Sequence, residues 1–152
     1  MCRMYAVLVP SLAVSVAQDL LSIAAGTNNS LTLHSVIATQ SSDFGDSEAE
    51  GLRFLIKQGA AAGSVGTTQT PVALDAGLPA SDASARKNDT TAGTGGTNVH
   101  EENANMQIGF IYKPTPEERI TIPGSGRITI NIPTAPTDAL TMSATAIFEE
   151  HG

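Results

Sequence analysis

Three histidines and one cysteine are the side chains of this sequence best suited to metal or nucleophilic chemistry. His34, His100 and His151 lie far apart in the chain, so no two of them have the short spacing with which one element offers two metal ligands. Two histidines and a carboxylate converging from separate strands could form a facial metal site, which the sequence neither shows nor forbids. Cys2 is the only cysteine, which excludes an intrachain disulfide and a cysteine-cluster metal site. We expect satisfied or solvated histidines, no metal site and no cofactor.

Acidic residues are densest at Asp43, Asp46, Glu48 and Glu50. An oxygen-rich loop of this kind is what Ca²⁺ requires. The spacing matches no EF-hand loop, however, and Phe44 interrupts it. The pattern therefore favours a solvated acidic turn.

Motifs of the common enzyme classes are missing from the sequence. It contains no Gly-x-Ser-x-Gly elbow, no P-loop and no His-Glu-x-x-His. Adjacent glutamates occur at 101–102, 117–118 and 149–150, but neighbours on a strand point to opposite faces. Adjacency alone therefore makes no acid–base pair, and we expect that the protein is not an enzyme.

The composition indicates which secondary structure positions these side chains. A chain of 152 residues fits one domain, residues 1–152. Only 15% of the residues are charged, against 41% hydrophobic, with 14 glycines and 8 prolines. Soluble helices are normally rich in Glu, Lys and Arg, whereas polarity here rests on Thr, Ser, Asn and Gln. The composition predicts an all-β protein with many turns.

Charge and hydropathy exclude several partners. The net charge is −7 and Trp is absent, so phosphate neutralisation and base stacking are both disfavoured, and we expect no direct nucleic acid binding. No apolar run reaches the roughly 18 residues that span a bilayer, so we expect no membrane association. The first 17 residues imitate a secretory signal, but Pro10 interrupts the apolar stretch. We expect a retained N-terminal strand there.

Period-2 alternation dominates the C-terminal half. It is present over residues 106–113, 128–132 and 141–148, and the intervening segments are rich in Pro and Gly. This rhythm predicts antiparallel strands with short connections.

The N-terminal half is less regular. A β-branched stretch predicts a strand from residue 31 to about residue 40. Residues 11–25 and 47–58 each admit a capped amphipathic helix or short strands, which in the first segment would be edge strands. The all-β composition favours strands in both.

Residues 59–105 have low hydrophobicity and read as long polar loops, interrupted by short strands near 71–74 and 88–91. Such loops bury too little surface to order themselves, so we expect neighbouring chains to support them. About 8–9 short strands with near-regular turns predict an antiparallel β-sandwich, jelly-roll-like in its connections.

The chain also resembles a group of small tailed-bacteriophage virion proteins, the capsid decoration or cement proteins with a jelly-roll-like sandwich. The resemblance lies in framework and turn segments: Ala17-Gln18-Asp19-Leu20, Gln40-Ser41-Ser42-Asp43 with Gly45-Asp46, Pro116-Glu117-Glu118-Arg119-Ile120, and Asp138-Ala139-Leu140-Thr141-Met142-Ser143 through Phe148-Glu149-Glu150.

The resemblance implies a structural protein of the virion, located on the capsid exterior. Its partners would be the major capsid protein and further copies of itself in a homotrimer, and it would stabilise the shell by bridging capsomers. Candidate contact residues are Pro116, Glu117, Glu118 and Arg119, which combine a rigid proline with exposed charge. A carbohydrate-binding sandwich, a tail or neck component of the same virion and a cupin-like metalloenzyme with clustered His34 and His100 are the alternatives.

Overall fold

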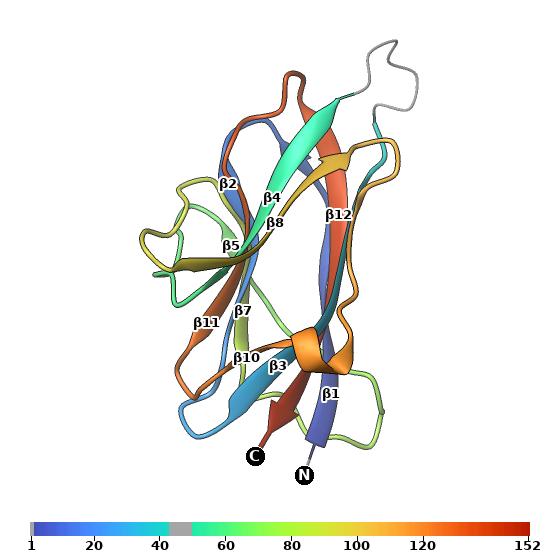
Figure 1. Ribbon diagram of the computed structural model, residues 1–152. Helices are drawn as coiled ribbons and strands as arrows, with labels where there is room; N and C mark the ends of the chain where they lie inside the picture. The colour runs from blue at the N-terminus through green and yellow to red at the C-terminus, as the bar shows by residue number, and fades with distance from the viewer. Residues whose placement is uncertain (1, 43–49) are drawn as a thin grey trace.

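The protein is a sandwich of two antiparallel sheets (Figure 1). The computed structural model describes residues 2–42 and 50–152. Sheet A contains six strands, which are Cys2–Val14 (β1), Ser30–Gln40 (β3), Val72–Ala73 (β6), Phe110–Tyr112 (β9), Ile120–Ile122 (β10) and Leu140–His151 (β12). Sheet B contains six more, which are Gln18–Ala24 (β2), Gly51–Gln58 (β4), Thr67–Gln69 (β5), Ser84–Asp89 (β7), Thr97–Asn105 (β8) and Arg127–Ile132 (β11). A short 3-10 turn, Pro116–Glu118 (η1), precedes β10.

The strand pairing is that of a jelly roll. β1 pairs with β12, β2 with β11, β3 with both β9 and β10, and β4 with β8. The early strands therefore pair with the late strands in reverse order, and β9 and β10 share one position in that order. Such nested antiparallel pairing gives a double-sheet jelly roll of eight strand positions. The predicted all-β sandwich is confirmed.

The other three strands enlarge the two sheets. β5, β6 and β7 lie between β4 and β8 in the chain. β6 extends sheet A beyond β1, while β7 and β5 extend sheet B beyond β2. The total is twelve strands in the described part of the chain, more than the 8–9 predicted, and β1, β3 and β12 are long rather than short.

Alternating side chains of β12 form the centre of the core. Phe148 points inward with no exposed surface, and its ring lies 5.7 Å from that of Tyr5 on β1. Phe54 and Phe110 stack at 4.6 Å and join the two sheets. Each such burial contributes about 1.5–3 kcal/mol, so these rings stabilise the sandwich together with the many buried aliphatic side chains around them.

Most predicted strands are confirmed, with three corrections. Residues 11–25 contain strands and no helix, but β1 continues to Val14, and β2 is an interior strand of sheet B instead of an edge strand. Of the strand predicted over 106–113, only β9 forms, because residues 106–108 make a turn, in which the amides of Ile108 and Gly109 donate to the Asn105 carbonyl. The predicted strand in 47–58 is β4, while residues 43–49, including most of the acidic cluster, lie outside the described residues.

The segment 59–105 was expected to be largely loop, but it contains β5, β6, β7 and β8. Contacts within the chain hold at least two of its loops. Asp19 and Asp89 are each 1% exposed and accept backbone N–H groups from Gly93 at 2.7 Å and Gly66 at 2.9 Å, respectively. Buried charge–dipole hydrogen bonds of this kind replace the apolar burial that the loops lack.

Glycine is required where these loops approach the sheet. A Cβ on Gly93 would lie 1.9 Å from the carbonyl oxygen of Ala61, a contact that real side chains do not make. The loop can therefore reach Asp19 only because Gly93 has no side chain.

We expect Asp19→Ala to lower the free energy of unfolding by about 3 kcal/mol, because it leaves the Gly93 amide and the Asn131 side-chain amide without their buried acceptor. Urea denaturation measures the change, and hydrogen exchange at Gly93 should accelerate. The matched control is Asp138→Ala, at an exposed aspartate, with little change. Equal stability of the two variants would show that the buried carboxylate does not order the loop.

Candidate functional site on the outer face of sheet A

The outer face of sheet A carries two neighbouring rows of uncharged side chains. Cross-strand partners in an antiparallel sheet share a face, and the first row crosses β1, β12, β3 and β9 through Leu8, Thr145, Ile37 and Ile111. The second row crosses β6, β1, β12 and β3 through Val72, Ala6, Ile147 and Ser35. We call these eight residues the uncharged face.

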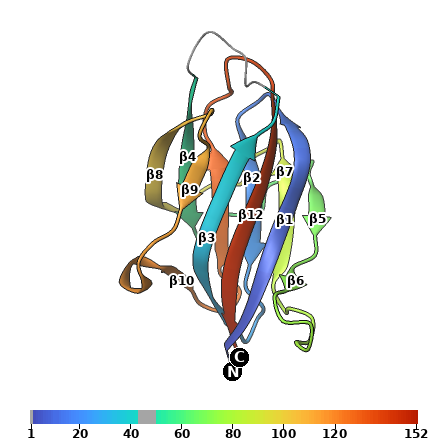
Figure 2. The ribbon, with the colours of Figure 1, turned by 90° about the vertical axis from the view of Figure 1, so that its right-hand side faces the viewer.

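Large apolar side chains of the uncharged face are open to solvent. Leu8 is 46%, Ile111 49% and Val72 52% exposed. In Figure 2, which looks onto this sheet, β3, β12 and β1 lie side by side and face the viewer. Grouped, exposed apolar residues mark interaction surfaces more often than isolated ones do.

Sheet B differs because its own loops cover it. Ser22 and Thr129 are each 1% exposed and Asn131 is 3% exposed, although all three are polar. The loop that contains Gly93 bonds to Asp19 beside them. Of the two outer faces in the described structure, that of sheet A is therefore the one open to a flat partner.

A groove of about 410 Å³ adjoins the uncharged face at β9. Its walls come from β8, β9 and the segment leading to β10, including Val99, His100, Tyr112 and Glu118. Ile111 belongs both to this groove and to the uncharged face, so the two form one continuous surface.

Tyr112 fixes one wall of the groove. Its hydroxyl donates to the Glu118 carbonyl oxygen at 3.2 Å, and its ring centroid lies 4.8 Å from that of His100. Burial, with a smaller effect of the Glu118 carboxylate, raises the pKa of Tyr112 above its ordinary value of 10.0. The phenol therefore stays protonated and continues to donate to Glu118 at neutral pH.

The four contact residues predicted from the sequence lie beside this groove. Pro116, Glu117 and Glu118 form η1, Arg119 follows it directly, and Glu118 lines the groove. The Glu118 carboxylate accepts from the backbone N–H and the hydroxyl of Thr115, at 3.3 Å and 3.0 Å. This capping box makes η1 a well-defined protrusion at the border of the uncharged face.

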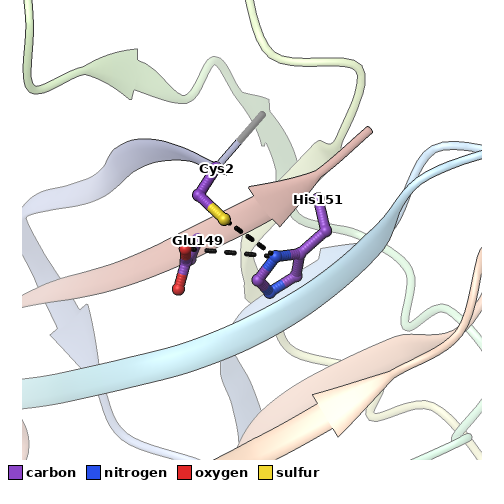
Figure 3. Close-up of side chains that lie close together, drawn as sticks. All are labelled: Cys2, Glu149 and His151. Atoms are coloured by element: carbon purple, nitrogen blue, oxygen red, sulfur yellow. Dashed lines mark hydrogen bonds and ion pairs between the residues drawn. The ribbon is translucent and has the colours of Figure 1, made fainter.

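A second group of reactive side chains lies where the two chain ends meet (Figure 3). Cys2, Glu149 and His151 come within 4.8 Å of one another through their ligand atoms, and we call them the terminal cluster. His34 Nε2 lies 2.9 Å from Oε2 of Glu149. Hydrogen bonds from Cys2 and, less strongly, from His34 lower the pKa of Glu149, while that carboxylate raises the pKa of Cys2.

The terminal cluster was not predicted from the sequence. Cys2 and His151 are at opposite ends of the chain, and only the pairing of β1 with β12 brings them opposite each other. The prediction that adjacent glutamates point to opposite faces is confirmed at one pair, because Glu149 is partly exposed and Glu150 is buried. His34 and His100 are each beside their own carboxylate on different surfaces, so the structure gives no support to a cupin-like histidine cluster.

Comparison with known proteins adds no identification. No protein-family model matches the chain, and neither a curated protein nor a solved structure matches it significantly. In residues 2–42 and 50–152, no helix has the length and apolar character to cross a membrane. The resemblance to phage decoration proteins therefore stays a prediction.

We expect Tyr112→Phe to lower the free energy of unfolding by about 1 kcal/mol through loss of the bond to Glu118. Because the folded pKa of Tyr112 lies above the unfolded value, its contribution is fully present below pH 10 and is lost as the pH rises through the folded pKa. The difference between wild type and variant should therefore be constant below pH 10 and shrink above it. Urea titrations across this range test the prediction, and a gap that widened in alkali would contradict it.

Proposed function

We propose that the chain is a structural virion protein that binds the outer surface of a tailed-phage capsid and stabilises the shell by bridging capsomers. The observation that carries the proposal is the uncharged face on a jelly-roll sandwich. In a chain of net charge −7, two rows across the outer face of sheet A contain only apolar, small and hydroxyl side chains. This composition supports a contact with another protein.

The physical properties of this face suit a stable protein contact. Leu8, Ile37 and Ile111 offer apolar area, and Thr145 and Ser35 offer hydroxyls that lose little side-chain entropy on binding. β1, β3 and β12, which carry most of these side chains, are long and paired on both sides, so the centre of the surface needs little rearrangement to bind.

Charged groups lie at the border of the uncharged face. Glu117, Glu118 and Arg119 adjoin the groove next to Ile111, which matches the polar rim of typical interfaces. The predicted contact residues would therefore set orientation at the rim, and the apolar rows would supply most of the affinity.

The acidic charge of the whole chain also agrees with a position outside the shell. A protein with a net charge of −7 is not drawn towards packaged DNA.

We propose in addition that the chain associates into a homotrimer. Sedimentation equilibrium should give a mass about three times 15.6 kDa, and a monomer across the micromolar range would contradict the trimer.

A carbohydrate-binding module is the second candidate, and the groove beside Tyr112 is the observation that favours it. Sugar rings commonly stack on an exposed aromatic face. Tyr112 is only 7% exposed, however, and His100 already lies against its ring. The groove therefore offers little aromatic surface, and we place this function second.

Co-sedimentation with expanded capsids stripped of accessory proteins tests the proposal. Wild type should bind saturably, at a fixed ratio to capsid subunits, and should raise the resistance of the shell to heat. Leu8→Asp should weaken binding by at least about tenfold, because it buries a charge in the contact.

The matched control is Val65→Asp, which changes a 76% exposed valine outside the uncharged face and should bind as wild type does. Absence of wild-type binding would overturn the capsid-exterior role and favour the tail or neck alternative. Equal weakening in both variants would show that the uncharged face is not the contact.

A further inference from the structure

The terminal cluster has the donor set and spacing of a metal site. Zn²⁺ takes four ligands at about 2.3 Å for sulfur, 2.0–2.1 Å for imidazole nitrogen and 2.0–2.2 Å for carboxylate oxygen, so neighbouring ligand atoms in a tetrahedral site are about 3.3–3.6 Å apart. Cys2 Sγ lies 3.5 Å from His151 Nδ1, and His151 Nδ1 lies 3.9 Å from Glu149 Oε1. All three atoms fall within 4.8 Å of one another.

We propose that Cys2, Glu149 and His151 bind one Zn²⁺ ion through Sγ, Oε1 and Nδ1, respectively. A thiolate, a carboxylate and a neutral imidazole exactly balance the two positive charges of the ion. Cys2 is exposed, so the fourth coordination position faces solvent and takes water.

The two partly exposed ligands, His151 and Glu149, each have a supporting partner already. His151 Nε2 lies 2.9 Å from the hydroxyl of Thr32, which lies 2.9 Å from that of Thr121. With Nε2 protonated and held by Thr32, Nδ1 carries the lone pair that a metal needs. Outer contacts of this kind orient histidine ligands in most zinc sites.

The two carboxylate oxygens of Glu149 have separate partners. Its Oε2 lies 2.9 Å from His34 Nε2, while Oε1 faces His151. One oxygen is therefore positioned by His34, and the other is available to the ion. Figure 3 shows the three ligand side chains converging from the paired ends of β1 and β12.

The backbone keeps this arrangement together without metal. Cys2 and His151 are directly opposite in the β1–β12 ladder, and Glu149 lies two residues away on the same face. Binding replaces the thiol proton by the ion and releases it to solvent. The site does not depend on the proposed capsid role, and it lies on the same sheet face but at the end where the chain termini meet.

Isothermal titration of ZnCl₂ into the metal-free, reduced protein tests the proposal, with a chain purified without a polyhistidine tag. One ion per chain should bind. Co²⁺ in place of Zn²⁺ should give a near-ultraviolet thiolate-to-cobalt charge-transfer band, which reports coordination by sulfur independently of affinity.

Cys2→Ser and His151→Asn should each weaken Zn²⁺ binding by more than about 100-fold, and Cys2→Ser should abolish the cobalt band. His34→Asn should weaken binding by about 10–100-fold, as outer-partner changes do. The control His100→Asn changes a histidine elsewhere in the structure and should have no effect. Absence of stoichiometric Zn²⁺ binding, or binding that Cys2→Ser and His151→Asn leave unchanged in correctly folded variants, would overturn the site.

Discussion

The arrangement of the loops around the sandwich depends on three buried carboxylates. Asp19, Asp89 and Glu150 are each only 1% exposed, and an ionised carboxylate is costly to bury unless donors surround it. The donors here come from loops. Gly93 donates to Asp19, Gly66 to Asp89, and the backbone amides of residues 82 and 83 to Glu150. These loops have too few apolar side chains to become ordered by burying them. The hydrogen bonds therefore stabilise both partners, since they fix the loops and satisfy the buried carboxylates.

Strand β12 links one of these loops to the terminal cluster. Strict alternation along β12 places Glu150 in the interior, where it pairs with Arg3 at 3.1 Å, and Glu149 on the outer face. The interior residue holds the β6–β7 loop, and the exterior residue joins Cys2 and His151. One strand therefore anchors a loop with one side and builds the terminal cluster with the other, so a change in its register would disrupt both.

Elements that depend on local pattern were predictable from the sequence. β11 and β12 alternate apolar and polar residues because one face of each points into the core between the sheets, and β3 was predicted from its β-branched stretch. β8 was missed, since it is an edge strand whose side chains are mostly exposed on both faces, so burial imposes no alternation on it. The roles of Asp19 and Glu150 were not predictable either, because nothing in their neighbouring residues shows which distant loop will reach them. The terminal cluster depends in the same way on pairing between the first and last strands.

The loops also explain why the two outer faces differ. The insertion that contains β5, β6 and β7 and the Gly-rich loops all follow β4, and the acceptors that fix the Gly-rich loops, Asp19 and Asp89, are on sheet B. Because the loops bind there, polar side chains of sheet B such as Thr129 are buried within the chain itself. Within residues 2–42 and 50–152, the outer face of sheet A is more open, and its central rows carry exposed Leu8 and Ile111 without any charge among them. A monomer would gain solubility from charges at those positions, so their absence supports the partner contact that we propose for this sheet.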